Sequence, residues 1–181
     1  MTAPTKVNSL NRVIFDTNIY GFLAKEASIA QIEPILIHNH HLIVYGCSVI
    51  RKELREAPKD ARIALLELYD RITKERTLES SNDAETLAEE YYQEAKSKGQ
   101  KKPWDDMRND FLIVAIASLN NLDIVFSDDA KTMSSPVSVQ AYQVVNLRHN
   151  LRPPNLLSYS VLKQSFIPEK NDLLMAKPPY L

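Results

Sequence analysis

The chain has 181 residues, a length typical of one domain that is large enough to bury a substantial core. Hydrophobic residues make up 44% and charged residues 25%, proportions that are ordinary for a soluble globular protein. The formal net charge of −1 gives the whole chain no electrostatic signature of nucleic-acid binding, so such a partner would require a local basic patch or bound cations.

The single cysteine, Cys47, excludes an internal disulfide and suits a reducing compartment. It lies in an apolar stretch, so we expect a small buried side chain there. No apolar run approaches about 18 residues, and the N-terminal sequence lacks a hydrophobic signal region. We therefore expect a cytoplasmic protein with no membrane partner.

The apolar pattern alternates between short strands and longer helices. In chain order it predicts a strand over 12–15, a helix over 29–39, a strand over 42–47, a helix opened by Ser48 and closed by Pro58, helices over 61–74 and 82–96, a buried helix over 106–119, a strand over 124–126, and a helix from Ser135–Pro136 to about 148. The second of the long helices is expected to begin with a capping box, Asn82 to Glu85. This order predicts an α/β protein with a central, mostly parallel sheet flanked by helices.

A helical arm and a C-terminal extension stand apart from this alternation. The arm, at about 60–99, belongs to the main domain, which is interpreted as residues 1–150. Residues 151–181 show little periodicity and are interpreted as a C-terminal extension that wraps the surface or is mobile.

Acidic residues recur at equivalent places along the predicted elements. Asp16 ends the first strand, Glu53 lies one turn into the helix after the second strand, and Asp129, with Asp128 beside it, follows the third strand. Asp110 lies early in the buried helix that leads back to that third strand. Because a crossover helix runs antiparallel to the strands it connects, all four positions fall at the carboxyl edge of the sheet.

A group of acids at one edge requires compensation. Asp110 shares a helical face with buried apolar residues, and Asp106, one turn earlier, is predicted to share that face as well. Two carboxylates about 4 Å apart repel each other by about 4 kcal/mol at an effective dielectric constant near 20. They must be protonated, pair with a cation or bind a metal. Because the expected ligands are all oxygens, the sequence favours Mg²⁺ or Mn²⁺ over zinc.

These motifs resemble those of PIN-domain ribonucleases, the family that includes the VapC toxins of toxin-antitoxin pairs. The resemblance rests on the stretch FDTN at Asp16, SVIRKEL around Glu53, DFLIVAIA from Asp110 and SDD ending at Asp129, and it covers residues 12 to about 133. It implies a three-layer PIN-like fold and an endoribonuclease that cleaves RNA and leaves a 5′-phosphate and a 3′-hydroxyl. It also implies an antitoxin partner and a homodimer, and the helical arm is a candidate for the dimer interface or for a substrate clamp. The long arm and the extension beyond Arg148 depart from compact toxin members.

The resemblance also assigns roles to individual residues. It implies that Asp16, Glu53, Asp110 and Asp129 are the catalytic metal ligands, with Asp128 as the alternative within the acidic doublet. Supporting groups that orient carboxylates or water would be Thr17, Asn18, Ser127 and Asp106. Residues expected to contact the RNA backbone are Arg51, Lys52, Arg55, Lys101 and Lys102.

Each of these residues also has a purely structural explanation. Asp16 can be a strand-ending cap, Glu53 part of a solvated helix face, and Asp110 an acid favoured by the helix dipole. Asp128 or Asp129 can serve only an Asx-turn. The basic residues can be solvated surface groups, Trp104 can pack into the core, and the histidines at 38, 40 and 41 are best explained as surface residues.

Two other functions remain open from the sequence. A catalytically silent PIN-like domain that binds nucleic acid or acts as a scaffold would be expected to lack one of the acids, and none is missing. A haloacid-dehalogenase-like phosphohydrolase also begins with an aspartate after its first strand. That family needs a second aspartate two residues later, where this chain has Asn18.

Overall fold

A computed structural model describes residues 10–38, 41–74, 76–164 and 166. Its centre is a sheet of five parallel strands in the order β3-β2-β1-β4-β5. The strands are β1 (Asn11–Phe15), β2 (Leu42–Cys47), β3 (Thr77–Leu78), β4 (Ile124–Phe126) and β5 (Asn155–Leu157). The prediction of an α/β protein with a parallel sheet is confirmed.

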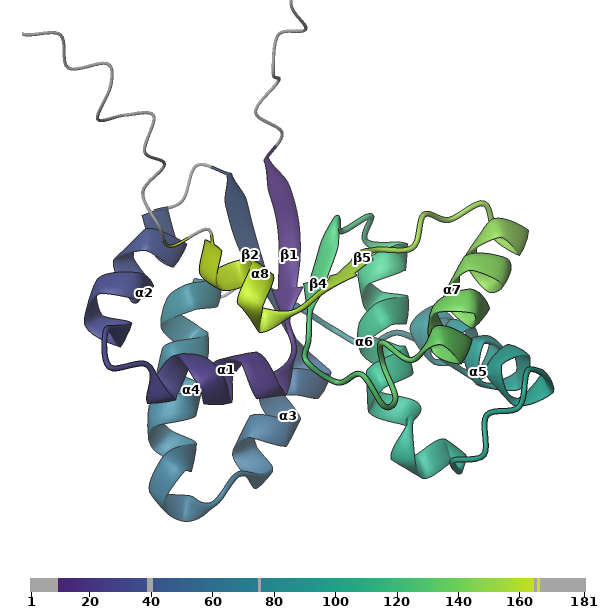
Figure 1. The fold of residues 1–181 in the computed structure, drawn as a ribbon, viewed down its shortest axis with the longest axis horizontal. Coiled ribbons are helices and arrows are strands. Elements are labelled where there is room, and N and C mark those ends of the chain that lie inside the picture. Colours follow the sequence, from purple (N-terminus) through teal and green to yellow (C-terminus); the bar gives the residue numbers. More distant parts are fainter. Residues whose placement is uncertain (1–9, 39–40, 75, 165, 167–181) are drawn as a thin grey trace, which may run out of the picture.

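The described residues form eight α-helices, and two groups of them flank the sheet (Figure 1). The first group is α1 (Thr17–Lys25), α2 (Ile29–His38), α3 (Ser48–Glu56) and α4 (Lys59–Thr73), and the second is α5 (Asn82–Ser97), α6 (Arg108–Leu119) and α7 (Pro136–Arg148). Figure 1 shows the first group to the left of the strands and the second to their right. The last helix, α8 (Tyr159–Gln164), returns to the first group, where the rings of Tyr159 and Phe22 stack 5.2 Å apart.

The central strand and the most apolar helix form the interior. Val13, Ile14 and Phe15 of β1 are fully buried, as expected for a parallel strand covered on both faces. In α6, every residue from Phe111 to Ser118 is buried. A helix that is apolar all round must lie inside the molecule, so the sequence of α6 explains its position.

The strand order creates a crevice at one edge of the sheet. β1 pairs with β2 on one side and with β4 on the other. The chain therefore leaves β1 and β4 toward opposite faces of the sheet, through α1 and α7 respectively (Figure 1). In open α/β sheets, ligands bind in the crevice outside the carboxyl ends of the strands where the strand order reverses.

Several details of the elements differ from the predictions. Ser48 is the first residue of α3 and not its cap; its hydroxyl accepts a hydrogen bond from Ser80 N at 3.1 Å. The helix predicted to open with Asn82 is capped one residue earlier, by Ser81, whose hydroxyl accepts from Ala84 N at 3.2 Å. Ser135 does cap α7, as predicted.

The two regions set apart by the sequence are partly built into the sheet. The helical arm is interrupted by β3, which pairs with β2. Within the C-terminal extension, β5 pairs with β4 and α8 buries Tyr159 and Leu162. Residue 165 and residues 167–181 of the extension lie outside the described residues.

Other predictions concern single residues. Cys47 is buried, as predicted, and its burial raises the pKa of the thiol to about 11. His38 and His41 lie at the surface, whereas residue 40 lies outside the described residues. Among the helices that the structure describes, none is long and apolar enough to cross a membrane.

Candidate functional site

Four acids lie at the carboxyl edge of the sheet, on four different elements. Asp16 directly follows β1 and caps α1, accepting a hydrogen bond from Thr17 N at 2.7 Å. Glu53 lies in α3, which follows β2 without a break. Asp110 lies in the first turn of α6, and Asp129 lies in the loop that leaves β4.

Asp16 is buried and held by side chains from two segments. Asp16 is only 5% exposed to solvent. Ser127 Oγ donates to Asp16 Oδ2 at 2.7 Å, and Asn18 Nδ2 donates to the same oxygen at 2.6 Å. Burial raises the pKa of Asp16 to about 6, and the charges of Glu53 and Asp129 act in the same direction. The hydrogen bonds lower the pKa but do not cancel the burial.

Glu53 is fixed from two directions. Asn109 Nδ2 donates to Glu53 Oε1 at 2.7 Å, and the hydroxyl of Thr17 donates to Glu53 Oε2. The contacts tie α3 to the start of α6 and to the start of α1. Glu53 therefore points into the crevice and is not part of a purely solvated helix face.

Asp110 is the most perturbed of these acids. The pKa of its carboxyl is raised to about 7, mainly by burial, and the charges of Asp16, Asp129 and Glu53 act in the same direction. The hydroxyl of Thr132 donates to Asp110 Oδ2 and acts against this rise. An acid that only capped a helix would gain stability from the helix dipole; Asp110 instead carries an unfavourable charge into a partly buried position.

The acidic doublet divides into two environments. Asp129 Oδ1 accepts from the backbone N of Lys131 and of Thr132, each at 2.9 Å, and Asp129 Oδ2 accepts from the hydroxyl of Thr132. Burial favours a higher pKa for Asp129, but these hydrogen bonds and the charge of Lys102 hold it below its ordinary value. Asp128 is exposed, and its Oδ1 accepts from Tyr159 N at 2.8 Å. Asp129 therefore both forms an Asx-turn and faces the other acids, whereas Asp128 does not face them.

The four carboxylates fit a hard divalent cation by their chemistry. All supply oxygen donors, and within the described chain none of the four forms a salt bridge. Among the described residues, however, no three acids, histidines or cysteines form a ready-made coordination group. Hydroxyl and amide groups donate hydrogen bonds to the carboxylates instead, and the hydroxyl of Thr132 lies between Asp110 and Asp129.

The predicted supporting residues are distributed unevenly. Thr17, Asn18 and Ser127 each hydrogen-bond to one of the four acids, as an orienting role requires. Asp106 is exposed and lies in a 3₁₀ turn (Trp104–Asp106) before α6 begins. The helical face that it was predicted to share with Asp110 is therefore absent at that position.

The predicted substrate-binding residues also differ in their surroundings. Arg51 forms an ion pair with Asp70 at 3.0 Å, which matches the structural explanation for it. Lys52, Arg55, Lys101 and Lys102 are exposed. The charge of Lys102 contributes to lowering the pKa of Asp129. Its loop is held by Gln100 Oε1, which accepts from the backbone N of Lys101 and Lys102 at 2.9 and 3.0 Å.

Sequence reasoning missed Asn109 and Thr132. Asn109 immediately precedes Asp110, and an amide beside a predicted ligand could have been considered as its neighbour's support. Thr132 follows Asp129 by three residues, a spacing at which an Asx-turn brings the side chains together. Neither position had an apolar or charge pattern that identified it.

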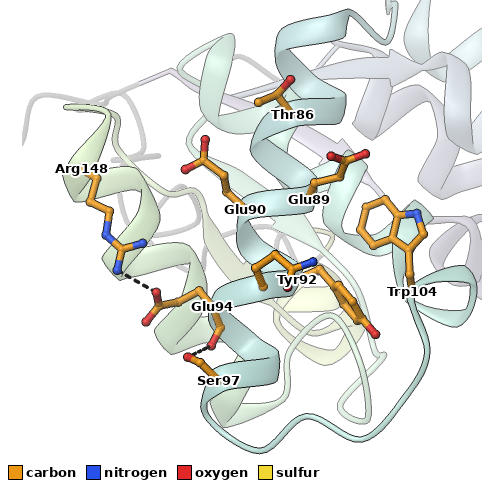
Figure 2. Close-up of a pocket in the computed structure, with 9 residues that line it drawn as sticks. Thr86, Glu89, Glu90, Tyr92, Glu94, Ser97, Trp104 and Arg148 are labelled. Carbon is orange, nitrogen blue, oxygen red and sulfur yellow. Dashed lines mark hydrogen bonds and ion pairs between the residues drawn. The ribbon is translucent and has the colours of Figure 1, made fainter.

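A separate groove of 620 Å³ lies outside this site, along α5 and beside α7 (Figure 2). Glu89, Glu90 and Glu94 line it, and Arg148 forms an ion pair with Glu94 at 2.8 Å. Trp104 also lines the groove and packs against Tyr92, with ring centroids 5.4 Å apart. An acidic lining repels a polyanion, so this groove is a poor place for RNA.

The fold and the site together define an α/β protein whose acids meet at a switch point of the sheet. Comparison with solved structures specifies the fold. It is similar to VapBC2 from Rickettsia felis bound to a promoter DNA fragment, over 81% of this chain and 98% of the matched chain, with a TM-score of 0.51 and 14% identity. FitAcB from Neisseria gonorrhoeae is similar over 80% and 96% of the two chains, with a TM-score of 0.53 and 14% identity. DNA-bound VapBC from Salmonella typhimurium is similar over 83% and 99%, with a TM-score of 0.52 and 13% identity.

The chain therefore has the PIN-domain fold of these VapBC and FitAB structures. No protein-family model and no curated protein matches the sequence. At 13–14% identity the likeness establishes the fold, and the roles of residues rest on the contacts described above.

Proposed function

We propose that this protein is a metal-dependent endoribonuclease that hydrolyses RNA phosphodiester bonds with Mg²⁺ or Mn²⁺ held by Asp16, Glu53, Asp110 and Asp129. The observation that supports this most is the pair formed by the buried Asp16 and the half-buried Asp110, whose pKa values are raised to about 6 and about 7. Buried carboxylates without a cationic partner cost folding free energy, and such arrangements concentrate at functional sites.

The side chains around the acids prepare them to bind cations. Ser127 and Asn18 orient Asp16, while Thr17 and Asn109 orient Glu53, each through hydrogen bonds to carboxylate oxygens. Bound Mg²⁺ or Mn²⁺ would neutralise phosphate charge, lower the pKa of a water molecule and stabilise the leaving oxygen. Lys102, beside Asp129, would attract the phosphates that flank the scissile bond.

The experiment compares purified variants on single-stranded RNA in Mn²⁺. Asp16→Asn, Asp110→Asn and Asp129→Asn should each reduce cleavage to background while leaving the circular dichroism spectrum unchanged. Asp128→Asn is the matched control, because Asp128 is the exposed member of the doublet and should retain most of the activity. Cleavage that persists in the Asp110→Asn variant would refute this site assignment.

A melting experiment tests the metal directly. Mn²⁺ should raise the melting temperature of the wild type and not that of Asp110→Asn, because a ligand stabilises only a protein that binds it. If Mn²⁺ stabilises neither protein and RNA binds without cleavage, the silent PIN-like scaffold becomes the better explanation. The phosphohydrolase alternative is disfavoured by Asn18, whose amide donates to Asp16 and cannot act as a general acid.

We also propose that the protein is the toxin of a toxin-antitoxin pair and binds an antitoxin. Support comes from the similarity to VapBC and FitAB structures, which are complexes bound to DNA. Induced expression in a bacterium should arrest growth for the wild type and not for Asp110→Asn. Equal growth of the two strains, with equal protein levels, would contradict the toxin role.

A further inference from the structure

Thr132 lies between the carboxylates of two of the acids, Asp110 and Asp129. It lies in the loop between β4 and α7 and is only 3% exposed. Its hydroxyl is within hydrogen-bond reach of Asp110 Oδ2 and of Asp129 Oδ2. Its backbone N also donates to Asp129 Oδ1 at 2.9 Å. One side chain thus joins the start of α6 to the loop after β4.

The loop around Thr132 is itself fixed. Ser134 N donates to the carbonyl of Asp129 at 2.8 Å, which closes the turn. The hydroxyl of Tyr142, a buried residue of α7, donates to the carbonyl of Met133 at 3.1 Å. Threonine is also β-branched, so its side chain has few accessible rotamers. The hydroxyl is therefore held in place by the fold and does not simply rotate toward a convenient acceptor.

Such a hydroxyl has a specific effect on two neighbouring carboxylates. Two acids facing each other repel, and separation is their simplest response. A threonine hydroxyl carries one proton, which it shares between the two facing oxygens and which partly offsets their repulsion. The two carboxylates remain directed at the same small volume.

We propose that Thr132 is a positioning residue, which keeps Asp110 and Asp129 directed at a common divalent cation. This inference rests on the proposed function, because it concerns how the same site acquires its metal. Thr132 would act only through the two carboxylates, so it should govern affinity for the ion more than the rate at saturating ion. Groups that orient metal ligands typically contribute 10–100-fold to metal affinity.

The test compares Mn²⁺ binding by calorimetry in the full-length, metal-free protein with the Mn²⁺ concentration needed for RNA cleavage. Thr132→Val keeps the shape of the side chain and removes the hydroxyl; its Kd for Mn²⁺ should rise by about 10–100-fold. Cleavage at saturating Mn²⁺ should approach the wild-type rate. Thr132→Ser restores the hydroxyl and should restore the affinity.

Thr73→Val is the matched control. Thr73 is a buried threonine of α4 whose hydroxyl donates to the carbonyl of Tyr69 at 2.9 Å, away from the acids. Removing this hydroxyl should leave the affinity for Mn²⁺ unchanged. If Thr132→Val does not fold, Thr132→Ala with Thr132→Ser provides the same comparison.

The outcomes separate this inference from the proposed function. If the wild type binds Mn²⁺ and cleaves RNA while Thr132→Val binds Mn²⁺ equally well or more tightly, the positioning role is wrong and the nuclease proposal stands. If the wild type neither binds Mn²⁺ nor cleaves RNA, the proposed function fails and this inference fails with it.

Discussion

The two buried carboxylates make the stability of the metal-free protein depend on pH. The pKa of Asp110 is raised from 3.8 to about 7 and that of Asp16 from 3.8 to about 6. Above about pH 4 the unfolded chain has released these protons, whereas the folded protein holds the proton of Asp16 up to about pH 6 and that of Asp110 up to about pH 7. Because the unfolded state then binds fewer protons, the free energy of unfolding falls as pH rises through this window.

Wild-type protein in a chelator should therefore be more stable to urea at pH 5 than at pH 7.5. In Asp110→Asn, the difference in the free energy of unfolding between these two pH values should be smaller by on the order of 2–4 kcal/mol, because an amide does not ionise. Glu67→Gln, which changes an exposed acid of α4, should keep the wild-type pH dependence. A wild type whose stability rises over the same pH window would contradict the raised pKa values.

At the residue scale, the sequence predicted acids at one edge of the sheet but not the side chains that hydrogen-bond to them. Asp16, Glu53 and Asp129 were placed by the ends of apolar strands and the start of the following helix, and these are strong signals. Thr132 and Asn109 had no such signal, because a hydrogen bond between side chains on different elements depends on distances of a few tenths of an ångström. The placement of Asp106 failed for a related reason: the helical period was extended backward past the true start of α6.

Among the elements, β2 is shaped by one glycine. A Cβ atom on Gly46 would lie 2.7 Å from Cζ of Tyr69 and 2.8 Å from Oγ1 of Thr77. Tyr69 is fully buried, and its hydroxyl donates to the carbonyl of Cys47 at 3.2 Å, so its ring cannot easily move. The absence of a side chain at Gly46 thus lets α4 pack directly over the junction of β2 and β3.

Gly46→Ala should consequently destabilise the protein by about 1–3 kcal/mol, the usual cost of overpacking a core. Gly21→Ala is the matched control, because a Cβ atom there has no neighbour within 4 Å. That variant should stabilise α1 by roughly 0.5–1 kcal/mol, since alanine loses less backbone entropy than glycine in a helix. Urea unfolding measures the change in the free energy of unfolding for each variant, which should be negative for Gly46→Ala and positive for Gly21→Ala. Equal changes would show that close packing at Gly46 does not explain the loss of stability.

The sequence did not predict β3, β5, α1 and α8. β3 has only two residues, and the three residues of β5 are exposed or half-buried, so β5 lacks the buried apolar run that identified the equally short β4. The hydrogen bonds of β3 and β5 to β2 and β4 depend on those strands already being in place. In contrast, β2, the end of β1 and α6 from Phe111 onward are largely apolar, and these elements were predicted to within about two residues.

For the molecule as a whole, the balance of charge bears on the proposed ribonuclease function. The formal net charge is −1, and acidic residues occupy both the carboxylate site and the groove along α5 (Figure 2). RNA therefore gains little from the overall field of the protein. In the proposed function, the approach of RNA would depend on bound cations and on basic groups such as Lys102, whose charge lowers the pKa of Asp129.

This dependence can be measured through salt. A protein that contacts Z phosphates of single-stranded nucleic acid has a slope of about −0.7Z when the logarithm of affinity is plotted against that of salt concentration. In the cleavage-deficient Asp110→Asn background, Lys102→Gln should make the slope less steep by about 0.7. Lys74→Gln is the control, because Lys74 is an exposed lysine in the connection from α4 to β3, on a different element from the four acids. If both variants keep the same slope, Lys102 contacts no phosphate, and RNA must bind through another face of the molecule.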